Sequence, residues 1–285
     1  MDRSNTETRH RPLNILLVVE APDDARTVAE LIDKVLLHHE ASPFFGRERH
    51  ELDEVRSWYD GLLAPEGTQI AHVTWAWLKS KGVRVNRAAN DGPYEYLRAA
   101  RRAILTVIDH CAAKNVVVDV VVLLVDADGD RTRRQGIESG AKEVPFEGTL
   151  VIGVPIETRE AWVLNAIELT DPAQKEVWRA IKKQIGVDCI KEAHLLTDKK
   201  GDEAPKKVLE RVLAAGKRSP KRRKDREGDA INERVERELK AIWDRTLGEL
   251  NQLGQHSGLS AFLVEAEAIL TRLTPSEAQA RTKAP

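Results

Sequence analysis

Two groups of acidic residues directly follow apolar runs, and their side chains are the ones in this chain best suited to chemistry. The first run, residues 14–19, ends at Glu20, and the second, residues 120–125, is followed by three aspartates at alternating positions, Asp126, Asp128 and Asp130. Apolar runs of this length are typical of buried parallel strands, and open α/β sheets bind ligands at the carboxyl ends of such strands. We therefore expect both acidic groups at one ligand-binding edge of a sheet.

Carboxylates that meet at such an edge repel one another unless a cation lies between them, and Mg²⁺ or Mn²⁺ suits oxygen ligands of this kind. Asp126 and Asp128 are two residues apart on a segment expected to be extended, so their side chains should project to the same side and hold one ion. Glu20 would complete a second ion site or act as general acid or base, and Asp130 would join through water. The alternatives are a helix-terminal charge for Glu20 and a turn residue for Asp130.

Two other acidic motifs begin in the same way. The segment from Asp126 to Asp130 starts like a calcium-binding EF-hand loop, but Arg131 stands where that loop needs glycine and Ile137 where it needs glutamate. The segment also resembles the DxDG motif of haloacid-dehalogenase phosphatases, whose first aspartate is a nucleophile. That family places the motif on its first strand, whereas more than a hundred residues precede it here. The phosphatase interpretation is kept as a second alternative.

The elements that must position these residues alternate between strand and helix. A helix is expected over residues 25–37 after the first strand, and a long amphipathic helix over 93–113 leads into the acidic strand. A further strand over 149–155 precedes a helix that carries Glu160. This order predicts an α/β fold with a mainly parallel sheet flanked by helices.

Helical periodicity dominates after residue 170. Four helices are expected there, over 173–185, 203–215, 229–253 and 259–273. We therefore expect an α/β core over 13–170, with an insertion at about 40–90 that holds one or two helices and a strand near 69–73. The rest would be a helical C-terminal region over 171–273 and flexible tails at 1–12 and 274–285.

The order of several short motifs resembles the TOPRIM fold of primases, topoisomerases and OLD-type nucleases. The signature of that fold is a glutamate after the first strand and a DxD after a later one, which Glu20 and the pair Asp126 and Asp128 match. Three further segments resemble more narrowly the TOPRIM-like bacterial proteins found beside ABC- or SMC-type ATPases in defence loci: 20–26, 160–164 and 204–209. The resemblance spans residues 13–215 with the insertion unmatched. Ala166 stands where the family often has an aspartate, which leaves the number of bound ions open.

The resemblance implies a Mg²⁺- or Mn²⁺-dependent nuclease that hydrolyses phosphodiesters of DNA or RNA. Glu20, Asp126 and Asp128 would be its catalytic and metal-binding residues, and Glu160 would either support the metal or pair with a neighbouring arginine such as Arg159. It also implies the effector of an anti-phage defence system with an ABC- or SMC-type ATPase as its partner. The main alternative is a non-catalytic TOPRIM-like scaffold or binding subunit of an ATPase complex.

Clustered basic residues are the candidates for nucleic-acid binding. Arg131 and its neighbours Arg133 and Arg134 would hold phosphate or balance the acidic charge, and Lys206 and Lys207 lie at a helix start, a poor place for cations unless anions bind there. Residues 217–226 hold seven basic residues in ten and form a solvated loop or a phosphate-contacting arm. The arm residues of most interest are Lys221, Arg222 and Arg223.

Composition excludes several other classes of function. Cys111 and Cys189 lack the spacing of a disulfide framework or a zinc site, and no glycine-rich phosphate loop is present, so the chain is not expected to hydrolyse ATP itself. No apolar stretch approaches the roughly 18 residues of a membrane span, and the sequence shows no secretory signal. We expect a cytoplasmic protein with no membrane partner.

Overall fold

The computed structural model describes residues 12–42, 44–54, 56–58, 72–83, 93–196, 201, 204–215 and 227–271. Within these residues one sheet is formed by five strands: β1 (Leu13–Val19), β2 (Arg56–Trp58), β3 (His72–Thr74), β4 (Val120–Leu124) and β5 (Thr149–Gly153). The strand order is β2-β1-β4-β5, and β3 pairs with β1 further along the edge that β2 occupies. Every pair is parallel, so the carboxyl ends of all five strands meet at one edge of the sheet.

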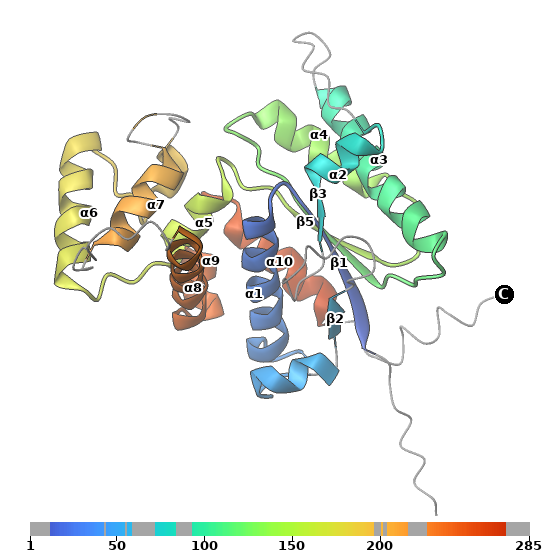
Figure 1. The fold of residues 1–285 in the computed structure, drawn as a ribbon, viewed down its shortest axis with the longest axis horizontal. Coiled ribbons are helices and arrows are strands. Elements are labelled where there is room, and N and C mark those ends of the chain that lie inside the picture. Colours follow the sequence, from blue (N-terminus) through green and yellow to red (C-terminus); the bar gives the residue numbers. More distant parts are fainter. Residues whose placement is uncertain are drawn as a thin grey trace, which may run out of the picture.

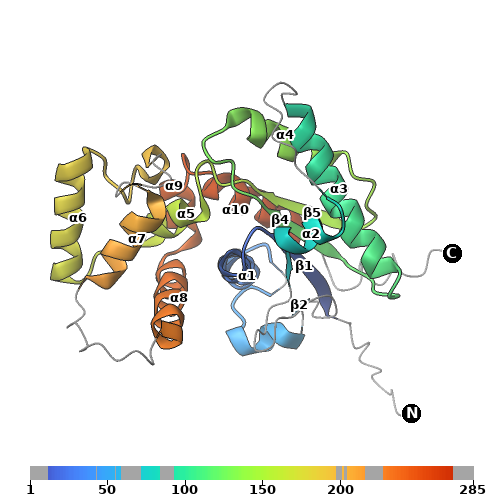
Figure 2. The ribbon, with the colours of Figure 1, turned by 45° about the horizontal axis from the view of Figure 1, so that its top comes forward.

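Helices cover both faces of the sheet, which explains why β1 and β4 are almost entirely apolar and buried (Figures 1 and 2). One face packs on α1 (Pro22–His38), α8 (Glu227–Asp244), α9 (Leu247–Leu253) and α10 (Leu259–Leu270). The other face packs on α2 (Trp75–Ser80), α3 (Pro93–Ala112) and α4 (Arg131–Lys142). The fold class expected from the sequence, an α/β fold with a mainly parallel sheet and a helical C-terminal part, is therefore confirmed.

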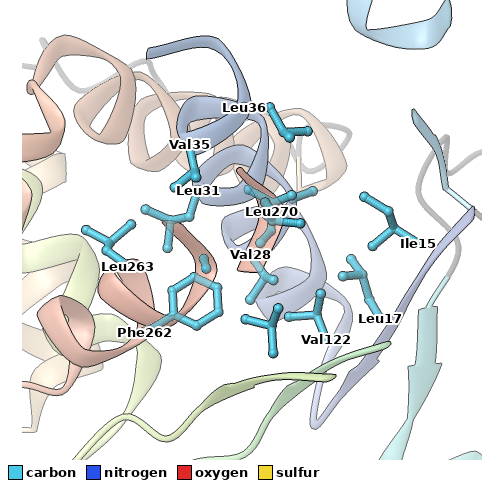
Figure 3. Close-up of a cluster of buried hydrophobic side chains, with 14 of the residues drawn as sticks. Ile15, Leu17, Val28, Leu31, Val35, Leu36, Val122, Phe262, Leu263 and Leu270 are labelled. Atoms are coloured by element: carbon cyan, nitrogen blue, oxygen red, sulfur yellow. The ribbon is translucent and has the colours of Figure 1, made fainter. Parts of the chain in front are cut away.

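The core under α1 joins the two ends of the described chain. Figure 3 shows Ile15 and Leu17 of β1 and Val28 of α1 in one cluster with Phe262 and Leu270 of α10. All five side chains are at least 99% buried. The C-terminal helices thus complete the core of the sheet.

A separate apolar cluster lies beside the sheet (Figure 1). It is built from α5 (Arg159–Ala166), α6 (Pro172–Ile185), the short 3-10 helix η2 (Ala193–Leu195) and α7 (Pro205–Ala214). Proline at the first position of α6 and α7 and the left-handed Gly186 after α6 set the limits of these helices. α5 belongs to this cluster through Val163 and to the sheet core through Trp162, so it connects the two.

Two glycines let α4 lie unusually close to α3. A Cβ atom added to Gly136 would lie 2.4 Å from the carbonyl oxygen of Pro93, and one added to Gly140 would lie 2.2 Å from that of Leu97. Both distances are far below van der Waals contact, so only glycine permits this approach. The close packing fixes the position of α4 relative to the carboxyl edge of the sheet.

Several helix limits agree with those expected from the sequence, but the prediction of one long helix over 229–253 is wrong. α3, α6 and α7 end within two residues of the expected limits. The helix expected over 229–253 is instead two helices, α8 and α9, because Thr246 caps α9 in a reciprocal capping box with Glu249.

The stretch expected to be an insertion at about 40–90 is partly built into the sheet. It supplies β2 and β3, and the 3-10 helix η1 (Arg49–Glu54) precedes β2. The strand expected near 69–73 is β3, which runs to residue 74. The tails expected at 1–12 and 274–285 lie outside the described residues, apart from Pro12. Among the helices of the described part of the chain, none is both long and apolar enough to span a membrane.

Candidate active site

The two acidic groups meet at the carboxyl edge of the sheet, because they follow adjacent parallel strands. Val18 of β1 lies opposite Leu123 of β4. Glu20 is two residues beyond Val18, and Asp126 is three residues beyond Leu123. The two residues therefore differ by about one position along the strand direction. The expectation from the sequence that both lie at one edge agrees with this placement.

The chain turns sharply after Asp126. Asp128 adopts a φ of 54° and Gly129 a φ of 70°, both in the left-handed region. The turn is held by backbone bonds to the segment after β5: the Asp128 N–H donates to the Glu157 carbonyl at 3.1 Å and the Gly129 N–H to the Ile156 carbonyl at 2.7 Å. The expectation that Asp126 and Asp128 project from one extended segment is therefore wrong, because the segment is no longer extended at Asp128.

Arg133, in the first turn of α4, bridges two of the candidate ligands. Its Nη2 donates to Glu20 Oε1 at 2.6 Å, and its Nη1 donates to Asp128 Oδ2. Asp130 is the N-cap of the same helix, and its Oδ1 accepts the N–H groups of Thr132 at 2.8 Å and Arg133 at 3.2 Å. Asp130 thus has the structural role of a cap, which the sequence left open.

Asp126 lies in an excess of negative charge. Its Oδ1 accepts the Arg159 N–H at 3.1 Å. Burial raises the pKa of Asp126 well above its usual value, and four neighbouring carboxylates raise it further: Glu20, Asp24, Glu160 and Asp128. Burial is also the largest cause of the raised pKa of Glu20, and it outweighs the opposing effect of Arg133. A cluster of this kind stabilises any cation that enters it.

A buried arginine compensates the part of the cluster next to α1. The guanidinium of Arg159 contacts Asp24 at 3.2 Å, Glu160 at 3.4 Å and Glu238 at 2.8 Å, and its side chain is 3% exposed. Burial raises the pKa of Asp24 to about 6 in spite of Arg159. At Glu160 burial acts in the same direction, but Arg159, two hydrogen bonds and Lys206 together outweigh it, so the pKa is lowered. Of the two roles considered for Glu160, the ion pair with Arg159 is the one that the structure contains.

A pocket of about 420 Å³ opens beside this edge of the sheet. It is lined by the carboxylates of Glu20, Asp128 and Asp130 and by Trp75, Lys79, Tyr96 and Arg133. The volume is within the range of small-molecule sites, and stacked bases or sugars commonly pack on aromatic walls. Among the described residues that line the pocket, Asp126 is absent, since it lies toward α1 and α5.

The basic candidates are spread over the molecule. Arg131 is exposed at the start of α4, and Lys206 and Lys207 are exposed at the start of α7. Lys207 pairs with Glu210 at 3.4 Å. The candidates in the basic segment lie outside the described residues: Lys221, Arg222 and Arg223.

The donor chemistry of the cluster fits a hard divalent cation, because it consists of carboxylate oxygens whose mutual repulsion raises the pKa of Asp126. The placement of these carboxylates does not form a ready metal site. Within the described ranges no three His, Cys, Asp or Glu side chains are grouped as a ready ligand set, and Arg133 lies between Glu20 and Asp128. A metal ion would therefore require the guanidinium to move.

Three residues of this site make contacts that the sequence did not indicate: Asp24, Arg133 and Arg159. Arg159 was expected only as a possible partner of Glu160, and Arg133 only as one of three arginines that hold phosphate or balance the acidic charge. Their signal was the charge itself, since acidic and basic residues close together at helix starts indicate ion pairs. Comparison of the chain with protein-family models, curated proteins and solved structures found no match.

Proposed function

We propose that this chain is a Mg²⁺- or Mn²⁺-dependent TOPRIM-like nuclease that hydrolyses phosphodiesters of DNA or RNA. The observation that supports this most is the crowding of carboxylates at the carboxyl ends of β1 and β4, where burial and the neighbouring carboxylates raise the pKa of Asp126. Enzymes that act on phosphates use such crowded carboxylates to hold cations. The order of short motifs that resembles the TOPRIM fold supports the same class.

Each residue has a role that its position supports. Glu20, Asp126 and Asp128 would hold the ion, which when bound would activate water and offset the charge that develops on the phosphoryl oxygens. The raised pKa of Glu20 also suits proton transfer near neutral pH. Lys79 would attract a phosphate in the pocket, since its side chain has no ion-pair partner within the described ranges.

The test is cleavage of single- and double-stranded DNA and of RNA by the purified protein with Mg²⁺ or Mn²⁺. We expect Glu20→Gln and Asp126→Ala to lose cleavage at least about a hundredfold, the usual effect of removing one such group. Glu176→Gln is the control, because Glu176 is an exposed carboxylate on α6. Cleavage at the wild-type rate by both site variants would overturn the proposal.

The biological context follows from the resemblance alone. We propose a role as effector of an anti-phage defence system, with an ABC- or SMC-type ATPase as the partner. Cleavage should then rise when that ATPase is added, and cells that express both proteins should lose viability or resist phage. Glu20→Gln should remove both effects.

A non-catalytic scaffold or binding subunit is the second candidate, and a specific contact favours it. Arg133 already compensates Glu20 and Asp128, so the site is stable without an ion. A scaffold would bind the ATPase equally well with Asp126→Ala and would cleave no nucleic acid with either metal. The phosphatase alternative has less support, since its nucleophile would be Asp126, which is not among the described residues that line the pocket.

A further inference from the structure

Arg133 contacts the candidate ligands with both ends of its guanidinium. Nη2 binds Glu20 and Nη1 binds Asp128, and the Arg133 side chain is 16% exposed. Two carboxylates from different strands are thus held by one planar cation, in the arrangement that arginine suits better than lysine. These two carboxylates are the ones that would have to turn toward an ion.

The backbone of Arg133 is fixed, whereas its side chain can move. Asp130 caps α4 at its first turn, and Gly136 and Gly140 hold the same helix against α3. The arginine side chain has several rotatable bonds, so a new position of the guanidinium needs no movement of the helix. Arg133 can therefore exchange its carboxylate partners for another anion by a change in the conformation of its side chain alone.

The pocket offers the displaced guanidinium a second position. Arg133 lines it together with Lys79, and the carboxylates of Glu20 and Asp128 lie on the same wall. A guanidinium released from these carboxylates would add a cation to this space. Arginine binds phosphate with two parallel hydrogen bonds, so the released side chain would suit a phosphate there.

We propose that Arg133 is a built-in counter-ion of this site, which a divalent cation must displace and which then turns into the pocket to bind a phosphate of the substrate. The inference rests on the proposed function for the identity of the metal and the substrate. Arg133 is a positioning residue in the metal-free protein, because it holds Glu20 and Asp128 beside each other. The site thereby exchanges one cation for another, and Glu20 and Asp128 have a cationic partner in both states.

The test measures the binding of Mn²⁺ and Mg²⁺ by calorimetry on the full chain without nucleic acid. Arg133→Gln should bind both ions about tenfold more tightly than the wild type, which corresponds to about 1.4 kcal/mol, because no competing guanidinium remains. Arg133→Lys should lie between the two, since an ammonium cannot bridge both carboxylates. Arg133→Lys also provides the test if Arg133→Gln folds poorly.

Arg134→Gln is the matched control. Arg134 is the next residue of α4, carries the same charge and pairs with Glu138 at 2.8 Å. We expect its affinity for both ions to stay within about twofold of the wild type, since long-range charge effects are screened at physiological salt. This control separates the loss of the bridge from the loss of one positive charge.

The outcomes distinguish this inference from the proposed function. Equal or weaker metal binding by Arg133→Gln, or no binding by any variant, would overturn the inference. Tighter binding by Arg133→Gln together with the absence of cleavage on any nucleic acid would leave the inference standing and overturn the nuclease. If the chain is a nuclease, Arg133→Gln should also raise KM for nucleic acid, because the phosphate contact is lost.

Discussion

At the scale of single residues, the carboxyl group of Asp126 is ionised at a cost in the metal-free protein. Burial and four nearby carboxylates raise its pKa, so the folded structure favours its protonated form. Residues that serve function are often destabilising in this way. The cost can be measured without knowledge of the substrate.

Asp126→Asn should therefore stabilise the metal-free protein. The asparagine Oδ1 can still accept the Arg159 N–H, while the repulsion from the neighbouring carboxylates disappears. We expect Tm at pH 7.5 in EDTA to rise by roughly 2–4 °C, the shift that about 1 kcal/mol gives in a domain of this size. Stabilisation by added Mn²⁺ should be lost in the same variant. A lower Tm for Asp126→Asn in EDTA would contradict the repulsion described here.

Asp24 predicts an unusual dependence of stability on pH. Its folded-state pKa is about 6, against an ordinary value of 3.8, so the folded protein binds more protons than the unfolded chain between these values. The contribution of Asp24 to stability is then highest below about pH 4 and falls as the pH rises to about 6. This direction is opposite to that of a carboxylate with a lowered pKa such as Asp188.

Urea denaturation of the wild type and Asp24→Asn in EDTA isolates this effect. The free energy of unfolding of the variant minus that of the wild type should increase from pH 4.5 to pH 7, by at most about 3 kcal/mol at 1.36 kcal/mol per pKa unit. The difference between the two proteins cancels the titration of groups distant from Asp24. A difference that is constant with pH would show that Asp24 titrates normally.

At the scale of elements, the docking of α4 on α3 decides where Arg133 lies. A Cβ on Gly140 would lie 2.2 Å from a backbone oxygen that cannot move aside without moving α3. Gly140→Ala should therefore lower the free energy of unfolding by about 1–3 kcal/mol, the usual cost of overpacking. Chemical denaturation measures it.

Gly248→Ala is the control for that prediction. Gly248 lies in α9, and a Cβ there would have no atom within 4 Å. Since alanine favours a helix over glycine by about 1 kcal/mol, this variant should be slightly more stable than the wild type. Equal effects of the two substitutions would mean that helix propensity, not close packing, determines the cost at Gly140.

The elements that the sequence predicted are those with a strong local pattern. The apolar runs of β1 and β4 and the helical periodicity of α3 are visible without tertiary information. α4 was missed because glycine stands where it touches α3, so its buried face has few apolar residues. β2 was missed because it is short and begins at a buried Arg56, which is compensated by Asp33 in a distant part of the chain.

The site was predicted to a similar extent and for similar reasons. The placement of Glu20 and Asp126 at one edge follows from parallel strands, which a sequence can indicate. The bridge through Arg133 depends on the left-handed turn at Asp128 and on the position of α4. Both arise from packing between distant segments, so no local sequence pattern predicts them.

At the scale of the whole molecule, the buried ion pairs of Arg159 join the sheet core to the cluster of α5, α6 and α7. Arg159 of α5 contacts Asp24 of α1 and Glu238 of α8, and Arg234 of α8 contacts Glu238 at 3.2 Å and Asp23 at 3.1 Å. Glu238 is 2% exposed. Buried pairs of this kind add little net stability, but loss of one partner is costly.

Arg159→Met should destabilise the protein by about 3 kcal/mol, because Glu238 then loses one of its two arginine partners while remaining buried. The double variant Arg159→Met with Glu238→Gln should recover part of that loss. A double-mutant cycle by urea denaturation measures the coupling. Additive effects of the two substitutions would show that the pair contributes nothing beyond packing.

The burial of β1 under α10 determines when this protein can fold as it is made. The ribosome delivers β1 first, yet Phe262, Leu263 and Leu270, which help to cover its face, are among the last described residues to be synthesised. Until they emerge, the nascent chain holds an apolar strand with an incomplete cover, which is a state prone to aggregation. Folding of the sheet must therefore wait until α10 has left the ribosome, and chaperones that shield apolar segments during synthesis should raise the yield of native protein.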